Sequence, residues 1–234
     1  MRFRPLGDRA ILVTLGDAVD EATHLRVRAA CARLDSHPVR GMVELVPGVA
    51  SVAVHYDPAA LAPRDGAEAH PYERIAEELG TALSGLREEE PPAPRKVEIP
   101  VCYGAAAGPD LADLARYHRV TPEAVVRMHL APEYVVQMIG FAPGFPYLGG
   151  LDPRIATPRR ATPRPLVPAG SVAIGGELTG VYPLASPGGW HLIGRTSARL
   201  FRVDADPPNL LRMGDRVRFR EITETELRAE ERRP

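Results

Sequence analysis

The ten residues from Arg87 to Lys96 constrain the fold of this chain more than any other segment. They read Arg-Glu-Glu-Glu-Pro-Pro-Ala-Pro-Arg-Lys, and Ala93 is their one apolar anchor. Their prolines prevent a helix from continuing and favour an extended linker. A chain of 234 residues is long enough for one or two domains. The sequence therefore predicts two domains, over residues 1–90 and 91–234.

Composition narrows the class of protein. A formal net charge of -1 argues against nucleic acid or an anionic membrane surface as the main partner. No stretch approaches the roughly 20 apolar residues that span a bilayer, and residues 1–16 lack the apolar core of a signal peptide. Cys31 and Cys102 are too few for a disulfide framework. We therefore expect reduced, buried thiols in a cytoplasmic protein.

The first 90 residues combine strand and helix patterns. Short apolar or alternating runs predict strands over 10–15, 42–46 and 51–56. Helices are expected from Asp20 and from Pro71, a favourable first-turn residue. Their expected apolar stripes are Ala22, Leu25, Ala29 and Ala32, and then Tyr72, Ile75, Ala76, Leu79, Leu83 and Leu86. This order predicts a ferredoxin-like βαββα domain, completed by a strand with Val97, Ile99 and Val101.

A short helical pair and a series of strands follow the linker. The helices are marked by Leu111, Leu114 and Ala115, and by Thr121-Pro122 with Val125, Val126 and Met128. The pair faintly resembles a helix-turn-helix, but it has too few arginines for a DNA-reading face, so we interpret it as a packed hairpin. Beyond it, Gly/Pro turns separate short apolar runs, which indicates a β-barrel or sandwich. Strands are expected over 134–139, 171–174, 178–182, 191–195, 199–203 and 216–222, and a charged helix over 224–234.

Three segments between Gly140 and Thr196 combine special backbone residues with aromatic, charged or reactive side chains. Residues 140–150 read Gly-Phe-Ala-Pro-Gly-Phe-Pro-Tyr-Leu-Gly-Gly, with aromatic rings that can wall a pocket. Residues 157–164 read Thr-Pro-Arg-Arg-Ala-Thr-Pro-Arg, and guanidinium groups bind carboxylate or phosphate with paired hydrogen bonds. Residues 186–196 contain Trp190 and His191, a side chain that exchanges protons near neutral pH.

Each of these segments also has a purely structural interpretation. The aromatic rings can fill a barrel core, the arginines can form solvated surface ion pairs, and His191 can be a satisfied structural histidine. Ser171 is not in a Gly-x-Ser-x-Gly elbow, and the chain has neither a Gly-x-x-x-x-Gly-Lys-Ser/Thr loop nor Gly-x-Gly-x-x-Gly after a strand. The histidines give no helix-spaced metal pair. The sequence therefore contains no self-contained active site, and we expect no metal site.

Long motifs occur in a characteristic order along the second half of the chain. They are Gly-Phe-Ala-Pro-Gly-Phe-Pro-Tyr-Leu, Thr-Pro-Arg-Arg-Ala-Thr-Pro-Arg, Val-Pro-Ala-Gly-Ser-Val-Ala-Ile, Tyr182-Pro, Ser-Pro-Gly-Gly-Trp and Ile-Gly-Arg-Thr. In this combination the chain closely resembles the family of 5-oxoprolinase B subunits. The same family is called allophanate hydrolase subunit 1, or Kip inhibitor after a member that inhibits a sporulation sensor kinase. Weaker likeness extends to residues 5–8, 46–48 and 213–215.

The resemblance implies an N-terminal α+β domain and a C-terminal cyclophilin-like β-barrel domain. It implies a 5-oxoprolinase complex with two partners, subunits A and C, which opens the lactam of 5-oxo-L-proline to glutamate with ATP hydrolysis. The second of these partners is expected to have a related barrel fold, and we call it the barrel partner. ATP with Mg²⁺ is then expected in the assembled complex, with no cofactor held tightly by this chain.

Two alternatives stay open. One is a regulator that inhibits a sensor histidine kinase, which would then be the partner. The other is a component of an allophanate or urea system. Fold alone does not separate them from the enzyme.

A composite site follows from these expectations. We predict that the 140–150 loop, the arginine loop and the turn at 187–191 converge on one face of the barrel, where a partner closes the cleft. His191 is the predicted catalytic residue, for proton transfer, and Arg164 the predicted anion anchor. The predicted substrate-binding residues are Arg159, Arg160, Arg164, Phe141, Phe145, Gly144, Ser171, Trp190 and Arg195.

Overall fold

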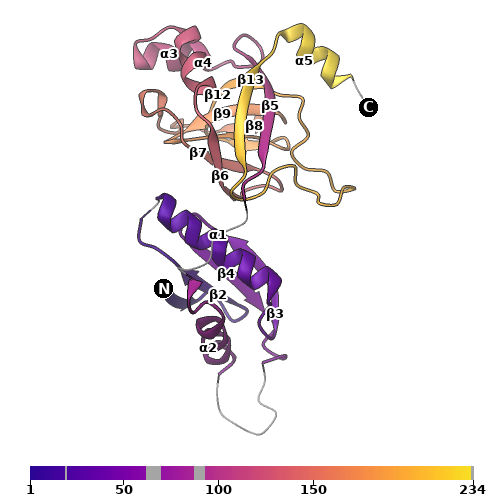
Figure 1. The fold of residues 1–234 in the computed structure, drawn as a ribbon. Coiled ribbons are helices and arrows are strands. Elements are labelled where there is room, and N and C mark those ends of the chain that lie inside the picture. Colours follow the sequence, from indigo (N-terminus) through magenta and orange to yellow (C-terminus); the bar gives the residue numbers. More distant parts are fainter. Residues whose placement is uncertain (19, 62–69, 87–92, 233–234) are drawn as a thin grey trace. The chain divides into compact units, whose positions relative to one another are not determined.

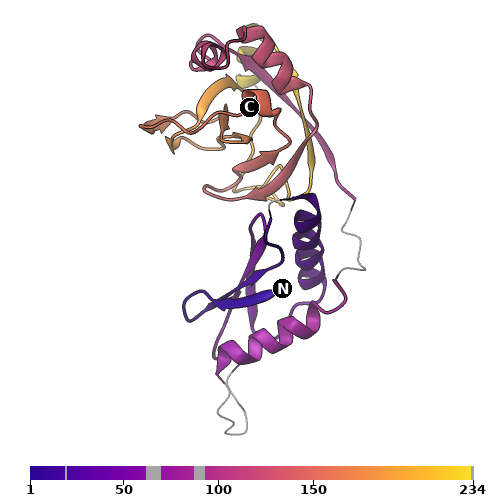
Figure 2. The same cartoon turned by 90° about the vertical axis from the view of Figure 1, so that its left-hand side faces the viewer.

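The chain forms two units that are described separately. The computed structural model describes residues 1–18, 20–61, 70–86 and 93–232. Contacts divide the chain into Met1–Ala93, an antiparallel sheet with helices, and Pro94–Pro234, which contains a closed seven-stranded barrel (Figures 1 and 2). The predicted mixed α+β class is confirmed. The linker expected at Arg87–Lys96 lies outside the described residues over 87–92, so the domain boundary at residue 90 stays a prediction.

The N-terminal unit is a four-stranded sheet in the order β1-β2-β4-β3, with every neighbouring pair antiparallel. Helix α1 packs against β3 and β4. Val52, Val54 and Tyr56 are buried on one face of β4, as the alternation predicts. The elements are β1 Arg2–Pro5, β2 Ala10–Thr14, α1 Glu21–Ser36, β3 Met42–Pro47, β4 Ser51–Tyr56 and α2 Pro71–Ala82.

The edge strand beside β2 differs from the prediction. The sequence predicts residues 97–101 there, and this is wrong: β1 takes that edge, pairing Phe3 with Val13 and Arg4 with Leu12. Residues 97–101 belong instead to β5 of the barrel. The charged Arg-Phe-Arg-Pro of β1 gives no alternating signal, because an exposed edge strand needs few buried side chains.

The two helices of this unit differ in how well their buried faces are predicted. In α2 the predicted stripe is confirmed, since Ile75 and Leu79 are fully buried. In α1 the helix begins as expected after Asp20, whose side chain accepts the Thr23 N–H at 2.7 Å. Its predicted stripe is wrong, because Leu25 is 38% exposed and Val27 and Leu34 are buried. Apolar side chains surround α1, and the stripe with the larger ones is buried because it removes more apolar area from water.

The barrel strands run in the order β10-β7-β6-β13-β5-β12-β9, and the ring closes between β9 and β10. Strands β8 and β11 form a separate two-stranded ribbon. Helices α3 and α4 lie beside each other as the predicted hairpin (Figures 1 and 2). The strands are β5 Lys96–Tyr103, β6 Tyr134–Ile139, β7 Pro146–Gly149, β8 Arg164–Val167, β9 Ser171–Gly175, β10 Leu178–Val181, β11 Ser186–Gly188, β12 His191–Arg195 and β13 Arg216–Glu221. The helices are α3 Leu111–His118, α4 Pro122–Leu130, the 3-10 helix η2 Pro153–Ile155 and α5 Glu224–Glu231.

One predicted barrel strand is absent. Residues 199–203 form no strand, and Phe201 makes only an isolated bridge to Asn209. The segment that returns past them contains Pro207 and Pro208, which have no backbone N–H to donate to a ladder. Across the part of the chain that the structure describes, no helix is long and apolar enough to cross a membrane.

A chain of polar groups runs through the barrel core around His129, which is fully buried. Thr179 Oγ1 donates to the Ala173 carbonyl at 3.0 Å, so this hydroxyl accepts from His129 Nε2 at 2.9 Å. Nδ1 is then the acceptor for the Tyr103 hydroxyl at 2.8 Å. Phe219 stacks on the imidazole at 4.6 Å between ring centroids. The ring is therefore satisfied in its neutral form, and burial lowers the pKa of His129 to about 3.

The buried histidine predicts an acid-sensitive barrel. The unfolded chain binds a proton at His129 below about pH 6.5, whereas the folded chain does not until about pH 3. The contribution of His129 to stability is therefore fully present above pH 6.5 and is lost as pH falls toward 3, at up to about 1.4 kcal/mol per pH unit. Urea unfolding, followed by fluorescence of Trp190, the one tryptophan, will show this loss between pH 7 and 5. His129→Gln will lower stability at pH 7 and flatten the dependence, and an unchanged slope in that variant would contradict the assignment.

Candidate functional site

Backbone contacts hold the arginine loop and the turn at 187–191 together. Thr157 and Gly176 form an isolated bridge at the start of the loop. Within the loop, the Arg160 N–H donates to the Gly189 carbonyl at 2.8 Å. At its end, Arg164 opposite Gly188 joins β8 to β11. The two segments thus form one surface, although they are separated by β9 and β10 in sequence.

Asp110, just before α3, collects the arginine side chains. Its buried Oδ1 accepts from Arg164 Nη2 at 2.6 Å and from Arg160 Nη1 at 3.3 Å, and its Oδ2 accepts the Leu192 N–H at 2.7 Å. Burial opposes ionisation of this carboxyl. The hydrogen bonds from Arg164 and Leu192 and the charges of both arginines outweigh burial and hold the pKa of Asp110 below its ordinary value. One carboxylate therefore fixes the arginine loop to α3 and β12.

The cluster carries more positive than negative charge, because two guanidinium groups share one carboxylate. The side chains of Arg164 and Arg160 are 24% and 35% exposed, so the cluster lies at the surface but is not free in solvent. Arg160 Nε and Arg164 Nη1 are buried and have no acceptor among the described residues. An unpaired buried donor costs about 1–3 kcal/mol. An oxyanion at this point would neutralise the excess charge and supply acceptors.

Aromatic rings back the arginine loop. Trp190 lies 5.5 Å from Phe145 and 5.8 Å from Tyr147 between centroids, and the Arg159 guanidinium lies 6.0 Å from the Trp190 ring. Phe145 and Trp190 are buried, so their rings belong to the core under the loop. Gly175 makes room for the indole, because a Cβ there would lie 2.5 Å from Trp190. The predicted aromatic wall and its structural interpretation therefore describe the same rings.

His191 lies beside a cavity of about 420 Å³. The cavity is lined by α3 residues, among them Asp113 and Tyr117, and by residues 157–161. His191 Nε2 is 2.9 Å from the Pro158 carbonyl, which only accepts, so Nε2 carries the proton and Nδ1 is an acceptor in the neutral ring. Nearby His118 contacts Thr157 Oγ1 at 2.9 Å. Burial, and secondly the charge of His191, lower the pKa of His118.

The first loop approaches this cluster by one residue only. Phe145 contacts Trp190, whereas Phe141 is 64% exposed and contacts Phe145 and Tyr182 at the other side of that ring. Gly144 has φ +79, and a Cβ on it would lie 2.8 Å from Phe201 Cβ, so the turn requires glycine. The structure thus places Phe145 with the arginines and leaves Phe141 at the rim.

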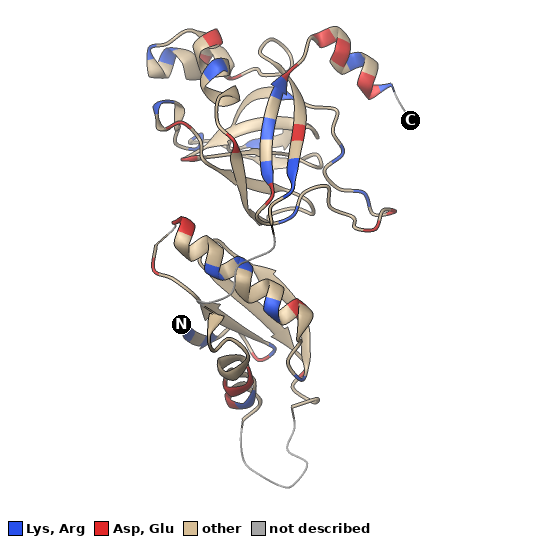
Figure 3. Ribbon diagram, in the orientation of Figure 1, with Lys and Arg blue, Asp and Glu red and all other residues tan. Residues whose placement is uncertain are grey.

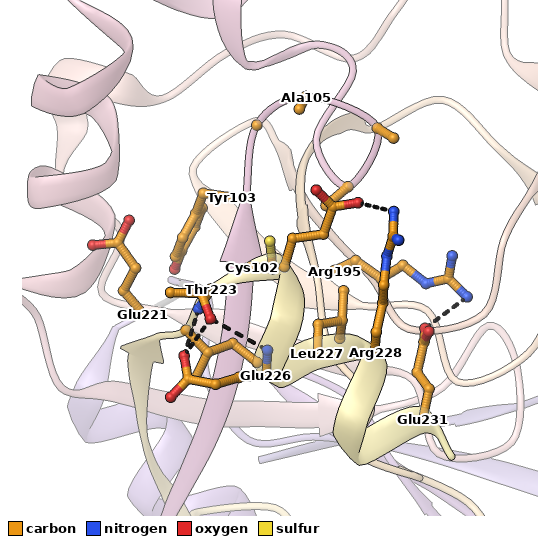
Figure 4. A pocket seen from close by; sticks show the side chains of 15 residues that line it. Cys102, Tyr103, Ala105, Arg195, Glu221, Thr223, Glu226, Leu227, Arg228 and Glu231 are labelled. Carbon is orange, nitrogen blue, oxygen red and sulfur yellow. Dashed lines mark hydrogen bonds and ion pairs between the residues drawn. The ribbon is translucent and has the colours of Figure 1, made fainter.

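Two predicted site residues lie at the other end of the barrel strands. Arg195 is opposite Ser171 in the β12–β9 ladder, and His191 is at the far end of β12. Ser171 is buried and donates to the Pro168 carbonyl at 2.8 Å. Arg195 pairs with Glu231 of α5 at 3.1 Å, within a separate cavity of about 700 Å³ that also includes Cys102 and Leu227 (Figure 4). The structure does not bring these two residues to the arginine cluster.

The sequence reasoning missed Asp110 and His118. Asp110 precedes a helix and resembles a cap, but its side chain caps nothing and points to arginines 50 and 54 residues away. Elsewhere on the barrel, arginines of β13 are paired: Arg218 with Glu133 and Arg220 with Glu98 (Figure 3). Within the described ranges, no group of three or more His, Cys, Asp or Glu side chains is placed to hold a metal ion.

Comparisons with known proteins place the chain. The family described as "Carboxyltransferase domain, subdomain C and D" matches residues 1–211. The 5-oxoprolinase B subunit of Bacillus subtilis (strain 168) is 44% identical over 229 residues, which cover 97% of this chain and 95% of that protein. The chain belongs to the family of 5-oxoprolinase B subunits. The resemblance drawn from the motifs is thereby confirmed.

Other members of the family agree. The 5-oxoprolinase B subunit of Escherichia coli O157:H7 is 46% identical over 215 residues, 92% of this chain and 93% of that protein. Among solved structures, TTHA0988 superposes with a TM-score of 0.77 at 36% identity over 92% of this chain. The match spans only 40% of TTHA0988, so that protein is much longer than this member of the family.

Proposed function

We propose that this chain is the B subunit of an ATP-dependent 5-oxoprolinase. With subunits A and C it opens the lactam of 5-oxo-L-proline with ATP hydrolysis to give L-glutamate. The observation that carries the proposal is the 44% identity to a 5-oxoprolinase B subunit over nearly the full length of both proteins. We place the complex in the cytoplasm, where the buried free thiols Cys31 and Cys102 stay reduced.

The arginine cluster is the proposed carboxylate site. The substrate carries one carboxylate, and the Asp110 cluster has excess positive charge and two buried donors without acceptors among the described residues. Guanidinium groups bind carboxylates through two parallel hydrogen bonds. Arg159, held over Trp190, lies along the same loop and adds a third cation. The lactam ring would then lie in the cavity beside His191, with Phe145 and Trp190 supporting the loop from below.

His191 is the proposed proton-transfer residue. Breaking the ring C–N bond leaves a nitrogen that takes up a proton, while the carbonyl carbon gains an oxygen. Nδ1 of His191 has no hydrogen-bond partner among the described residues, whereas Nε2 is fixed on Pro158. ATP with Mg²⁺ supplies the driving force in the assembled complex. Ser171 and Arg195, at the opposite strand ends, have no part in this site.

Reconstitution tests the function. We expect 5-oxoproline-dependent ATP hydrolysis from a mixture of the chain with subunits A and C, and none from the chain alone. His191→Ala should lower turnover by about a hundredfold, because a positioned acid or base contributes that much or more. His37→Ala, an exposed histidine of the N-terminal unit, is the matched control and should leave turnover unchanged. Both variants should co-purify with the barrel partner. Substrate-dependent hydrolysis by the chain alone, or full turnover with His191→Ala, would contradict the proposal.

A further inference from the structure

Three large apolar side chains of the barrel unit are exposed around Tyr182. Phe141 is 64% exposed, Leu166 63% and Leu184 42%. The Phe141 ring lies 6.4 Å from the Tyr182 ring, and Leu184 follows Tyr182 by two residues. The Tyr182 hydroxyl reaches the ribbon that carries Leu166, since a Cβ on Gly188 would lie 2.3 Å from that oxygen. We name Phe141, Leu166 and Leu184 the Tyr182 face.

Local backbone geometry holds two of these side chains outward. Phe141 has φ +71, a left-handed conformation that disfavours residues other than glycine. Leu166 lies in an irregularity of the ribbon, because Val167 pairs with Ser186 and Arg164 with Gly188, which gives β8 one residue more than β11. Strained backbone of this kind concentrates at binding sites. Phe141 also packs edge-on against Phe145 at 5.4 Å, so its ring is ordered before any partner binds.

A hollow of about 360 Å³ lies next to Phe141. Its walls include Gly144, Phe201 and Asn209. Asn209 Oδ1 is buried and has no donor among the described residues. Buried acceptors in proteins are normally paired. The hollow therefore fits an incoming side chain or backbone that brings one N–H or O–H donor.

We propose that the Tyr182 face docks the barrel partner, the subunit that would carry other carboxyltransferase subdomains. This rests on the proposed function. The matching family describes subdomains C and D over residues 1–211, so the remaining subdomains belong to other sequence. TTHA0988 joins the equivalent region to a longer remainder in one chain.

The chemistry of the docked surface follows from what this chain presents. Interfaces are enriched in aromatic residues and arginine. Beside the apolar Tyr182 face stands the arginine cluster, and Arg159 forms no ion pair with any described residue. The barrel partner should therefore offer an apolar pocket with an acidic rim.

Binding of the purified barrel partner to the immobilised full-length chain tests the docking face. Phe141→Asn keeps the left-handed backbone, which asparagine tolerates, and removes the ring. We expect it to weaken binding by about thirtyfold or more, as loss of an interface anchor does. Leu166→Gln should weaken binding in the same direction. Val43→Gln, at an equally exposed apolar residue of β3, is the control and should bind as the wild type does.

Thermal unfolding, followed by Trp190 fluorescence, should be unchanged in both face variants because the altered side chains are exposed. Binding of both variants within twofold of wild type would overturn the docking face. A wild-type homodimer that Phe141→Asn dissociates would also overturn it, since the occupant would then be a second copy. If the variants lose the barrel partner while the wild-type mixture shows no 5-oxoproline-dependent hydrolysis, the docking face stands and the proposed function fails.

Discussion

Asp110→Ala is expected to destabilise the barrel unit by about 2–4 kcal/mol at pH 7. The change removes the carboxylate that Arg160 and Arg164 share and the acceptor of the Leu192 N–H. Breaking a buried ion pair from one side costs about 3–5 kcal/mol, and the partial exposure of both arginines reduces that figure. Urea unfolding followed by Trp190 fluorescence measures the effect, because the single tryptophan packs beside the arginine loop.

Asp113→Ala is the matched control for Asp110→Ala. Asp113 lies on the same helix and pairs with Arg116, but both side chains are largely exposed. An exposed pair contributes about 0–1 kcal/mol. We therefore expect little change in the unfolding midpoint. Equal unfolding of the two variants would show that Asp110 does not organise the arginine loop.

Arg164→Ala should lower 5-oxoproline-dependent turnover of the reconstituted complex by about tenfold to a hundredfold. A hydrogen bond to a charged group contributes about 1.5–3 kcal/mol, and each 1.36 kcal/mol of barrier changes a rate about tenfold. Asp110 keeps Arg160 as a counter-ion, so the fold should tolerate the change better than Asp110→Ala. Lysine should restore little, since an ammonium lacks the planar pair of donors.

Arg154→Ala is the control for this arginine. Its guanidinium is exposed and pairs locally with Asp152, outside the Asp110 cluster. Turnover should stay at the wild-type level. If Arg164→Ala instead fails to co-purify with the barrel partner, Arg164 belongs to the interface and not to the carboxylate site.

The regular parts of the fold were predictable because periodicity and punctuation agree there. Strand β12 and strand β6 match their predicted ranges, since Gly/Pro turns bound short apolar runs. Strands β1, β8 and β11 were not predicted. They are short and rich in proline or arginine, so their sequences look like loops, and long-range pairing rather than local pattern makes them strands.

The site was predictable in part for the same reason. The arginine loop and His191 are unusual in sequence, and they do lie together in the structure. Asp110 carries no local signal, because its arginine partners are 50 and 54 residues away. Arg195 is four residues from His191 along an extended strand, which separates them by about 13 Å. Closeness in sequence therefore placed Arg195 in a site from which strand geometry removes it.

The central claim is that the Asp110 cluster receives the carboxylate of the substrate, and truncating the substrate tests it most directly. Removing that carboxylate from 5-oxoproline gives 2-pyrrolidinone. We would measure kcat/KM for both compounds with the wild-type complex and with the Arg164→Ala complex. The preference for 5-oxoproline should be at least about tenfold larger in the wild type, because the carboxylate and Arg164 are lost together. An equal preference in the two complexes would show that the carboxylate is bound elsewhere.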